Sequence, residues 1–236
     1  MFHFSKSSCL VLAGLALALV GGCAGAKVQP TMTSNRPLPK PDFIIVNNFA
    51  VTPGEVKLDR GLMATAVRDE KDRNPNEEEA KVGHYVAERL SVTLVEELRD
   101  KGITAVRSGP GVAPGNTTVI LNGQFMTIDQ GNQSERVWIG FGLGGSELRT
   151  RIQAVQAGEL IAQADTSTKS SLKPGMLTSA GASAAAGTGT ALAVGAATTG
   201  FSEAFMSTVE ADARRTAKEV AKRIHEGYVN RGWLEK

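Results

Sequence analysis

The chain contains 236 residues, and its 26 Lys and Arg residues nearly balance its 24 Asp and Glu residues. This balance gives no support for nucleic-acid binding, which depends on an excess of basic side chains. The length is sufficient for one domain with a real hydrophobic core, or for one domain plus an irregular arm.

Residues 1–22 have the pattern of a bacterial lipoprotein signal peptide. Lys6 precedes the apolar stretch Cys9–Val20, which suits a signal-peptide core and is too short to cross a bilayer as a helix. Two glycines then lead directly to Cys23. We therefore predict cleavage before Cys23 and attachment of lipid to its thiol. An ordinary secretory signal and a membrane-spanning helix are the less favoured alternatives.

Lipid attachment at Cys23 would fix the compartment of the protein. A single acyl chain binds a membrane only marginally, whereas the several chains of a bacterial lipoprotein hold firmly. Ala24 stands where an Asp would resemble an inner-membrane retention signal, so we predict an outer-membrane protein of a Gram-negative cell that faces the periplasm. Cys23 would be the only cysteine left, so the fold would depend on packing and not on disulfides.

Residues 23–41 are predicted to form the lipidated cysteine and a proline-rich tether. The stretch Val28–Pro41 contains four prolines separated mostly by polar residues. Prolines at this spacing resist helix formation and favour an extended chain of about 3.1 Å per residue. Fully extended, the tether would hold the domain about 40 Å from the membrane.

An α+β domain is expected to begin over residues 42–173. Phe43–Val46 is an apolar run typical of a strand, and a polar loop continues through Arg73. A helix is then predicted from Pro75 to about residue 101, ended by Gly102 as a C-cap. Its apolar residues recur every four positions: Val82, Val86, Leu90, Leu94 and Leu98.

Four further strands are predicted in this part of the chain, at residues 103–107, 117–129, 147–154 and 159–168. Polar and apolar residues alternate from Glu147 to Ala154. This alternation is typical of a strand with one polar face.

A glycine-rich run lies before the alternating strand. Gly140, Gly142 and Gly145 match the G-x-G-x-x-G pattern literally. That pattern binds a dinucleotide only where a helix follows, because the helix N-terminus meets the pyrophosphate, and here a strand pattern follows. We therefore interpret these glycines, together with Gly144, as structural residues that let strands pack closely or turn sharply.

This part of the chain resembles a family of bacterial lipoproteins that share domain of unknown function 4410. The similarity is carried by Gly131-Asn132, Arg136, Ile139–Gly144, Leu148 and Gly158–Ala162, with Gly-Phe-Gly as the most specific part. Glu210–Ala213 and Ala217–Ala221 resemble the closing helix of that family. The likeness covers roughly residues 42–232. The family has no assigned activity, so the resemblance implies no catalytic residues.

Residues 174–202 form a low-complexity segment that contains no charged residue. We interpret it as a flexible Gly/Ala-rich excursion. The alternative is a membrane-inserting or self-associating hairpin, because small residues recur every four positions. Residues 203–236 are expected to complete the domain with an amphipathic helix over about 203–228, whose basic face is either solvated or in contact with anionic lipids.

The sequence offers little for catalysis. The histidines of the mature chain, His84 and His225, fall on predicted helices without metal-ligand spacing. It contains neither a G-x-S-x-G elbow nor a P-loop. We therefore expect no catalytic residues, no metal and no cofactor.

Together these patterns predict an α+β fold in which a mostly antiparallel sheet is covered on one face by two long helices. The leading hypothesis is a non-enzymatic, membrane-anchored lipoprotein that binds envelope proteins in a transport or assembly complex, with a homo-oligomer possible. A membrane-inserting oligomer that uses residues 174–202 is the second hypothesis. An envelope hydrolase is the third.

Overall fold

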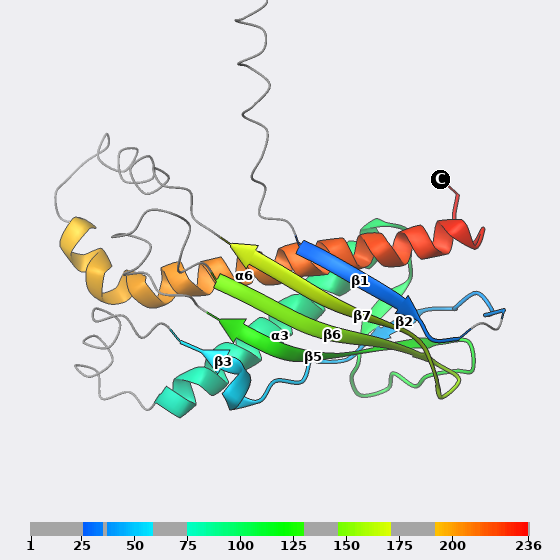
Figure 1. Cartoon of the computed structure of the whole chain (residues 1–236), viewed down its shortest axis with the longest axis horizontal. Coiled ribbons are helices and arrows are strands. Elements are labelled where there is room, and N and C mark those ends of the chain that lie inside the picture. The colour runs from blue at the N-terminus through cyan, green and yellow to red at the C-terminus, as the bar shows by residue number, and fades with distance from the viewer. Residues whose placement is uncertain (1–25, 35–36, 59–74, 130–145, 171–191, 236) are drawn as a thin grey trace, which may run out of the picture.

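The computed structural model describes residues 26–34, 37–58, 75–129, 146–170 and 192–235. In these ranges a sheet is covered on one face by two α-helices that pack against each other, α3 (Pro75–Asp100) and α6 (Leu192–Asn230) (Figure 1). This arrangement confirms the expected α+β class.

The sheet has the strand order β1-β7-β6-β5-β2-β4, and a short β3 pairs with β5 beyond the end of β2. The strands are β1 (Ala26–Met32), β2 (Ile44–Val46), β3 (Val56–Lys57), β4 (Ala105–Arg107), β5 (Val119–Asp129), β6 (Ser146–Gln156) and β7 (Glu159–Ser170). A 3-10 turn at Pro53–Glu55 leads into β3.

The sheet is mixed, which corrects the expectation of a mostly antiparallel sheet. The ladders β1–β7, β7–β6 and β6–β5 are antiparallel, whereas β2–β4, β2–β5 and β3–β5 are parallel. The parallel pairing has a topological cause. Helix α3 lies between β2 and β4 in the chain and brings the chain back to the end of the sheet where β2 begins. Strand β4 therefore runs in the same direction as β2.

The predicted tether is also corrected in part, because its first residues belong to the sheet. Strand β1 pairs with β7 in register from Ala26 with Thr168 to Met32 with Ala162. The chain there is extended, as the prolines suggest. Pro30 is tolerated because β1 is an edge strand, where a missing N–H costs no ladder bond on the open side.

Helix α3 confirms its predicted position. The N–H of Gly102 donates to the carbonyl of Arg99 and that of Ile103 to Leu98, the paired bonds of a Schellman cap. Helix α6 begins earlier than expected, at Leu192, so residues 192–202 are helical and not part of a loop. The rest of the Gly/Ala-rich segment, 174–191, lies outside the described residues.

Neither α3 nor α6, over the residues described, is long and apolar enough to cross a membrane.

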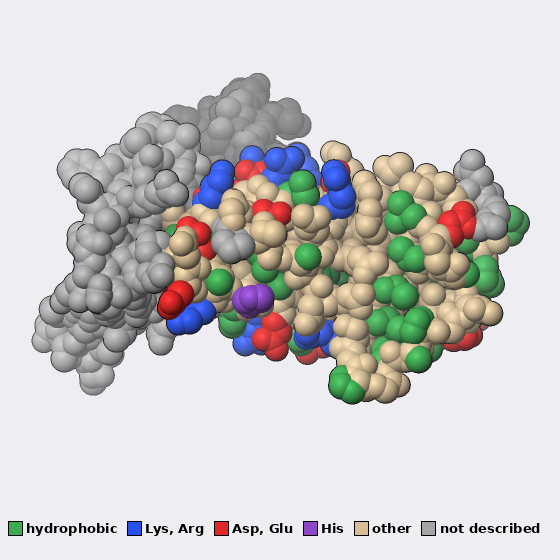
Figure 2. All heavy atoms as spheres, turned by 90° about the horizontal axis from the view of Figure 1, so that it is seen from below, with side chains coloured by type: hydrophobic (Ala, Val, Ile, Leu, Met, Phe, Trp, Pro, Cys, Tyr) green, Lys and Arg blue, Asp and Glu red, His purple; other side chains and the backbone are tan. Residues whose placement is uncertain are grey.

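The two faces of the sheet differ in polarity. The helix-facing side buries Leu121, Phe125, Leu148 and Ile152 against apolar residues of both helices. The opposite side of β6 and β7 carries ion pairs such as that between Arg151 and Asp165. The alternation predicted for residues 147–154 is therefore confirmed. Basic and acidic side chains are interspersed on the surface seen in Figure 2, with no large patch of one sign on that face.

Candidate ligand-binding pocket

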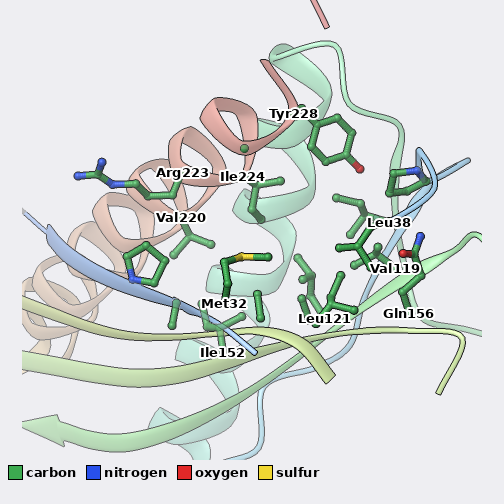
Figure 3. Close-up of a pocket in the computed structure, with 18 of the residues that line it drawn as sticks. Met32, Leu38, Val119, Leu121, Ile152, Gln156, Val220, Arg223, Ile224 and Tyr228 are labelled. Carbon is green, nitrogen blue, oxygen red and sulfur yellow. The ribbon is translucent and has the colours of Figure 1, made fainter. Parts of the chain in front are cut away.

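A mainly apolar pocket of about 170 Å³ lies between the C-terminal half of α6 and the helix-facing side of the sheet. Figure 3 shows Val220 and Ile224 pointing from α6 toward Met32 and Ile152 of the sheet, whereas Arg223 points away. Leu38, from the connection after β1, closes one side. The pocket is therefore framed by segments far apart in the sequence.

Small side chains account for this space. Ala154, Ala162 and Ala164 line the pocket on the sheet side, and Gly227 lines it on α6. Protein interiors are normally packed so densely that few voids exceed the size of a water molecule. The volume is similar to that of an engineered apolar cavity of about 150 Å³ that binds benzene. The pocket therefore has room for about six carbon atoms.

The end of α6 shapes one side of the pocket. Gly232 has φ of 69° and donates to the carbonyl of Val229, while the N–H of Trp233 donates to the carbonyl of Tyr228. These two bonds make a second Schellman cap, whose left-handed position suits glycine. The cap brings the indole of Trp233 edge-on to the ring of Tyr228, with 5.2 Å between the ring centroids. Tyr228 and Trp233 are thereby fixed at the pocket.

The hydroxyl of Tyr228 is buried without a hydrogen-bond partner among the described residues. The side chain lines the pocket, and the residue is only 8% exposed. Burial raises the pKa of this phenol to about 12, against a smaller opposing effect of the Arg231 charge. A buried, unpaired hydroxyl is costly and uncommon in proteins. It is therefore a natural donor to a ligand.

Arg231 provides a positive charge at the rim. Its guanidinium lies 5.3 Å from the ring centroid of Trp233 and contacts the sulfur of Met32 at 4.0 Å. It also donates to the carbonyl of Gly227 at 3.2 Å, but it forms no ion pair within the described ranges. Arg223 differs, because it pairs with Glu219 and Glu226. Of the two arginines that line the pocket, Arg231 is therefore the one without an acidic partner among the described residues.

The side chains that line the pocket are mostly aliphatic or aromatic, with two arginines and two glutamines. The pocket residues include no carboxylate and no imidazole, the groups most often used for proton transfer. Across the described residues, no cluster of three or more His, Cys, Asp or Glu side chains is placed to hold a metal ion.

Outside the pocket, a cluster of polar side chains around the buried carboxylate of Asp212 stabilises the fold. This carboxylate accepts hydrogen bonds from Ser146 at 2.6 Å and from Ser170 at 2.5 Å, and pairs with Arg215. It therefore ties the start of β6 and the end of β7 to α6.

A hydrogen bond also links the two helices, because the hydroxyl of Tyr85 on α3 donates to the carboxylate of Glu210 on α6 at 2.6 Å. That bond is the main reason why the pKa of Glu210 is lowered.

The residues singled out in the sequence lie apart from this pocket. Cys23 and the four structural glycines, Gly140, Gly142, Gly144 and Gly145, fall outside the described residues. His84 is exposed on α3, and His225 is half-buried on α6 without lining the pocket. Sequence reasoning missed Tyr228 and Arg231. The pair Gly232-Trp233 after α6 was the available signal, because a glycine followed by an apolar residue is typical of a helix C-cap that packs against the last turn.

The fold and the pocket define a small α+β domain with a mainly apolar pocket under one helix. The chain belongs to the DUF4410 family, a domain of unknown function, because the family model matches residues 44–195. This match stops before most of α6. No curated protein matches the sequence.

Several solved structures are similar to the chain at low identity. A PelC dodecamer from Paraburkholderia phytofirmans, in a single-substitution variant, is 14% identical with a TM-score of 0.35, and the match covers 81% of this chain and 97% of PelC. A second PelC dodecamer from the same organism is 13% identical, with a TM-score of 0.36 and coverage of 80% and 96%. An uncharacterized protein is 12% identical, with the same TM-score and the same coverage.

Proposed function

We propose that this protein is a lipid-anchored lipoprotein of the bacterial envelope whose domain binds partners and performs no catalysis. One observation carries the anchoring part. Strand β1 begins at Ala26, so only Ala24 and Gly25 separate the fold from Cys23. The first described strand therefore lies within three residues of the N-terminus that removal of residues 1–22 would leave.

This spacing replaces the long tether with direct attachment. Three extended residues span about 10 Å, so a lipid on Cys23 would hold the start of β1 close to the membrane surface. Thr168 pairs with Ala26, and Ser146 with Ser170 at the same end of the sheet. That end would face the membrane, and the pocket at the other end of β1 would face the periplasm.

The binding role is supported by the apolar pocket, by the Tyr228 hydroxyl, which has no hydrogen-bond partner among the described residues, and by Arg231, which has no ion pair among them. A hydrolase would need a nucleophile or an acid–base pair at its site, and no such pair lines this pocket. We further propose attachment to the outer membrane and contact with envelope proteins or with a second copy of the chain. Crosslinking in intact cells, followed by solubilisation and mass spectrometry, tests for those partners.

Substitution at Cys23 tests the anchoring. Cys23→Ser should abolish labelling by radioactive palmitate and should leave the precursor uncleaved or the protein free in the periplasm. Cys9→Ser is the matched control, because Cys9 lies in the predicted signal peptide. It should be labelled like the wild type and should fractionate with the outer membrane.

Two outcomes would contradict the proposal. Unlabelled Cys23→Ser protein that is still cleaved and retained normally would show that lipid on Cys23 is not the anchor. Resistance of that protein to carbonate extraction would instead favour the alternative in which residues 174–202 enter the bilayer.

A further inference from the structure

We propose that the pocket binds a single-chain anionic amphiphile, a fatty acid, with its alkyl chain beneath α6 and its carboxylate between Arg231 and Tyr228. This inference deepens the proposed binding function and rests on it for the biological setting. Four features of the described residues carry it: the apolar lining, the unpaired cation, the unpaired hydroxyl and the position of the pocket on the domain.

The apolar lining fits an alkyl chain. Val28, Ile152 and Ile161 on the sheet face Val220 and Ile224 on α6 across the pocket. No charged side chain interrupts this part, because Arg223 points outward and is paired with glutamates (Figure 3). About six carbons fill the volume, which fits a short alkyl chain whose far end lies inside the pocket. Met32, 49% exposed, is an apolar residue at the rim.

Arg231 fits a carboxylate at the mouth. A guanidinium can donate two parallel hydrogen bonds to a carboxylate. Arg231 already lies against Met32 and Trp233, so it is held at the pocket without an acidic partner in the described ranges. The guanidinium of Arg231 is exposed to water, which weakens its ion pair with a carboxylate. We therefore expect this contact to favour charged over uncharged ligands while adding little to the affinity.

The hydroxyl of Tyr228 fits the second oxygen of that carboxylate. The end of a helix normally disfavours an anion, because its last carbonyls carry partial negative charge. Here three of those carbonyls are already bonded: Tyr228 and Val229 accept from the Schellman cap, and Gly227 accepts from Arg231. The negative end of α6 is therefore largely satisfied, and among the described side chains that line the pocket the Tyr228 hydroxyl is buried without a hydrogen-bond partner.

The position of the pocket favours a single-chain ligand over a bilayer phospholipid. Met32 is at the opposite end of β1 from Ala26, a distance of about 20 Å for a strand of this length. If Cys23 is anchored, the mouth faces away from the membrane. A phospholipid would then have to leave the bilayer with both chains, whereas a fatty acid can enter from solution.

Calorimetric titration of the full protein purified from its native cells and reconstituted with phosphatidylcholine vesicles tests this proposal, with protein-free vesicles as the reference. The probes are butanoate, hexanoate and the uncharged hexan-1-ol. Burying one methylene is worth about 0.8 kcal/mol, or about fourfold in affinity, so hexanoate should bind about 16-fold more tightly than butanoate. Hexan-1-ol should bind more weakly than hexanoate.

Variants assign the contacts. Arg231→Gln should weaken hexanoate about twofold to fivefold, as expected for an exposed ion pair, and leave hexan-1-ol unchanged. Arg223→Gln is the matched control and should change neither, because its side chain points away. Tyr228→Phe should weaken hexanoate a few-fold without unfolding the domain, since it removes a hydroxyl that has no partner. Ala164→Leu should fill the pocket and weaken both six-carbon probes.

Three results would overturn the proposal: no saturable heat with hexanoate, equal affinity for butanoate and hexanoate, or equal effects of Arg231→Gln and Arg223→Gln. Preferential binding of hexan-1-ol would indicate an uncharged apolar ligand instead. These outcomes are independent of palmitate labelling at Cys23, so the anchoring and the ligand can fail separately.

Discussion

Removing the carboxylate of Asp212 should destabilise the domain more than removing any exposed carboxylate. Asp212 is 1% exposed and accepts from two serine hydroxyls, at 2.6 Å for Ser146 and 2.5 Å for Ser170, while pairing with Arg215. Breaking one side of a buried ion pair typically costs about 3–5 kcal/mol. Arg215 can turn toward water, since its side chain is 37% exposed. We therefore expect Asp212→Ala to cost about 3 kcal/mol, at the lower end of that range.

Thermal unfolding followed by circular dichroism measures this effect. For a domain of this size, about 3 kcal/mol corresponds to a drop in Tm of about 6–12 °C. Asp165→Ala is the matched control, because its ion pair with Arg151 lies on the open face of the sheet. That exposed pair should contribute less than about 1 kcal/mol. Equal Tm values for the two alanine variants would refute the assignment of Asp212 as the tie between α6 and the strand ends.

Three further predictions concern other parts of the fold. Gly123→Ala should destabilise the domain by about 1–3 kcal/mol, because its Cβ would lie 2.2 Å from the ring of Phe49; urea unfolding measures this, and an unchanged midpoint would contradict the close packing. Ala157→Asn should raise stability by up to about 1 kcal/mol, because Ala157 has φ of 51° in the β6–β7 turn, where Asn is preferred; a lower Tm would argue against this turn geometry. Burial raises the pKa of Tyr228 from 10.0 to about 12, so this tyrosine should ionise at a lower pH in the unfolded chain than in the folded one. The free energy of unfolding should therefore fall as the pH rises between those two values. Tyr228→Phe should lose this part of the decrease, and an unaltered dependence of stability on pH in that variant would show that the phenol is not buried.

The periodic elements could be predicted from the sequence because burial enforces their periods. The four-residue spacing of Val82, Val86, Leu90 and Leu98 places them on the buried side of α3, and each is 5% exposed or less. The alternation in β6 likewise follows from one buried and one solvated face. The end of α3 could be predicted from Gly102, because few other residues adopt its left-handed conformation.

The pairing of strands and the pocket could not be predicted in the same way. The parallel ladders of β2 depend on contacts between segments far apart in the chain, to which local patterns are insensitive. The prolines of residues 28–41 predicted extended chain, and the structure has a strand as far as Met32. Extended chain can be tether or edge strand, and pairing with β7 decides between them. The pocket arises from alanines on two strands opposite Gly227. A local sequence pattern cannot predict that these residues, which lie far apart in the chain, line one pocket.

We propose that lipid on Cys23 holds this domain directly at the membrane. Intact-mass and N-terminal peptide mass spectrometry of the protein isolated from its native membranes tests it most directly. We predict a mature chain that begins at Cys23 and carries the mass of a diacylglycerol and an additional acyl chain on that residue. A mature N-terminus at another residue, or an unmodified Cys23 in protein recovered from the membrane, would contradict the account.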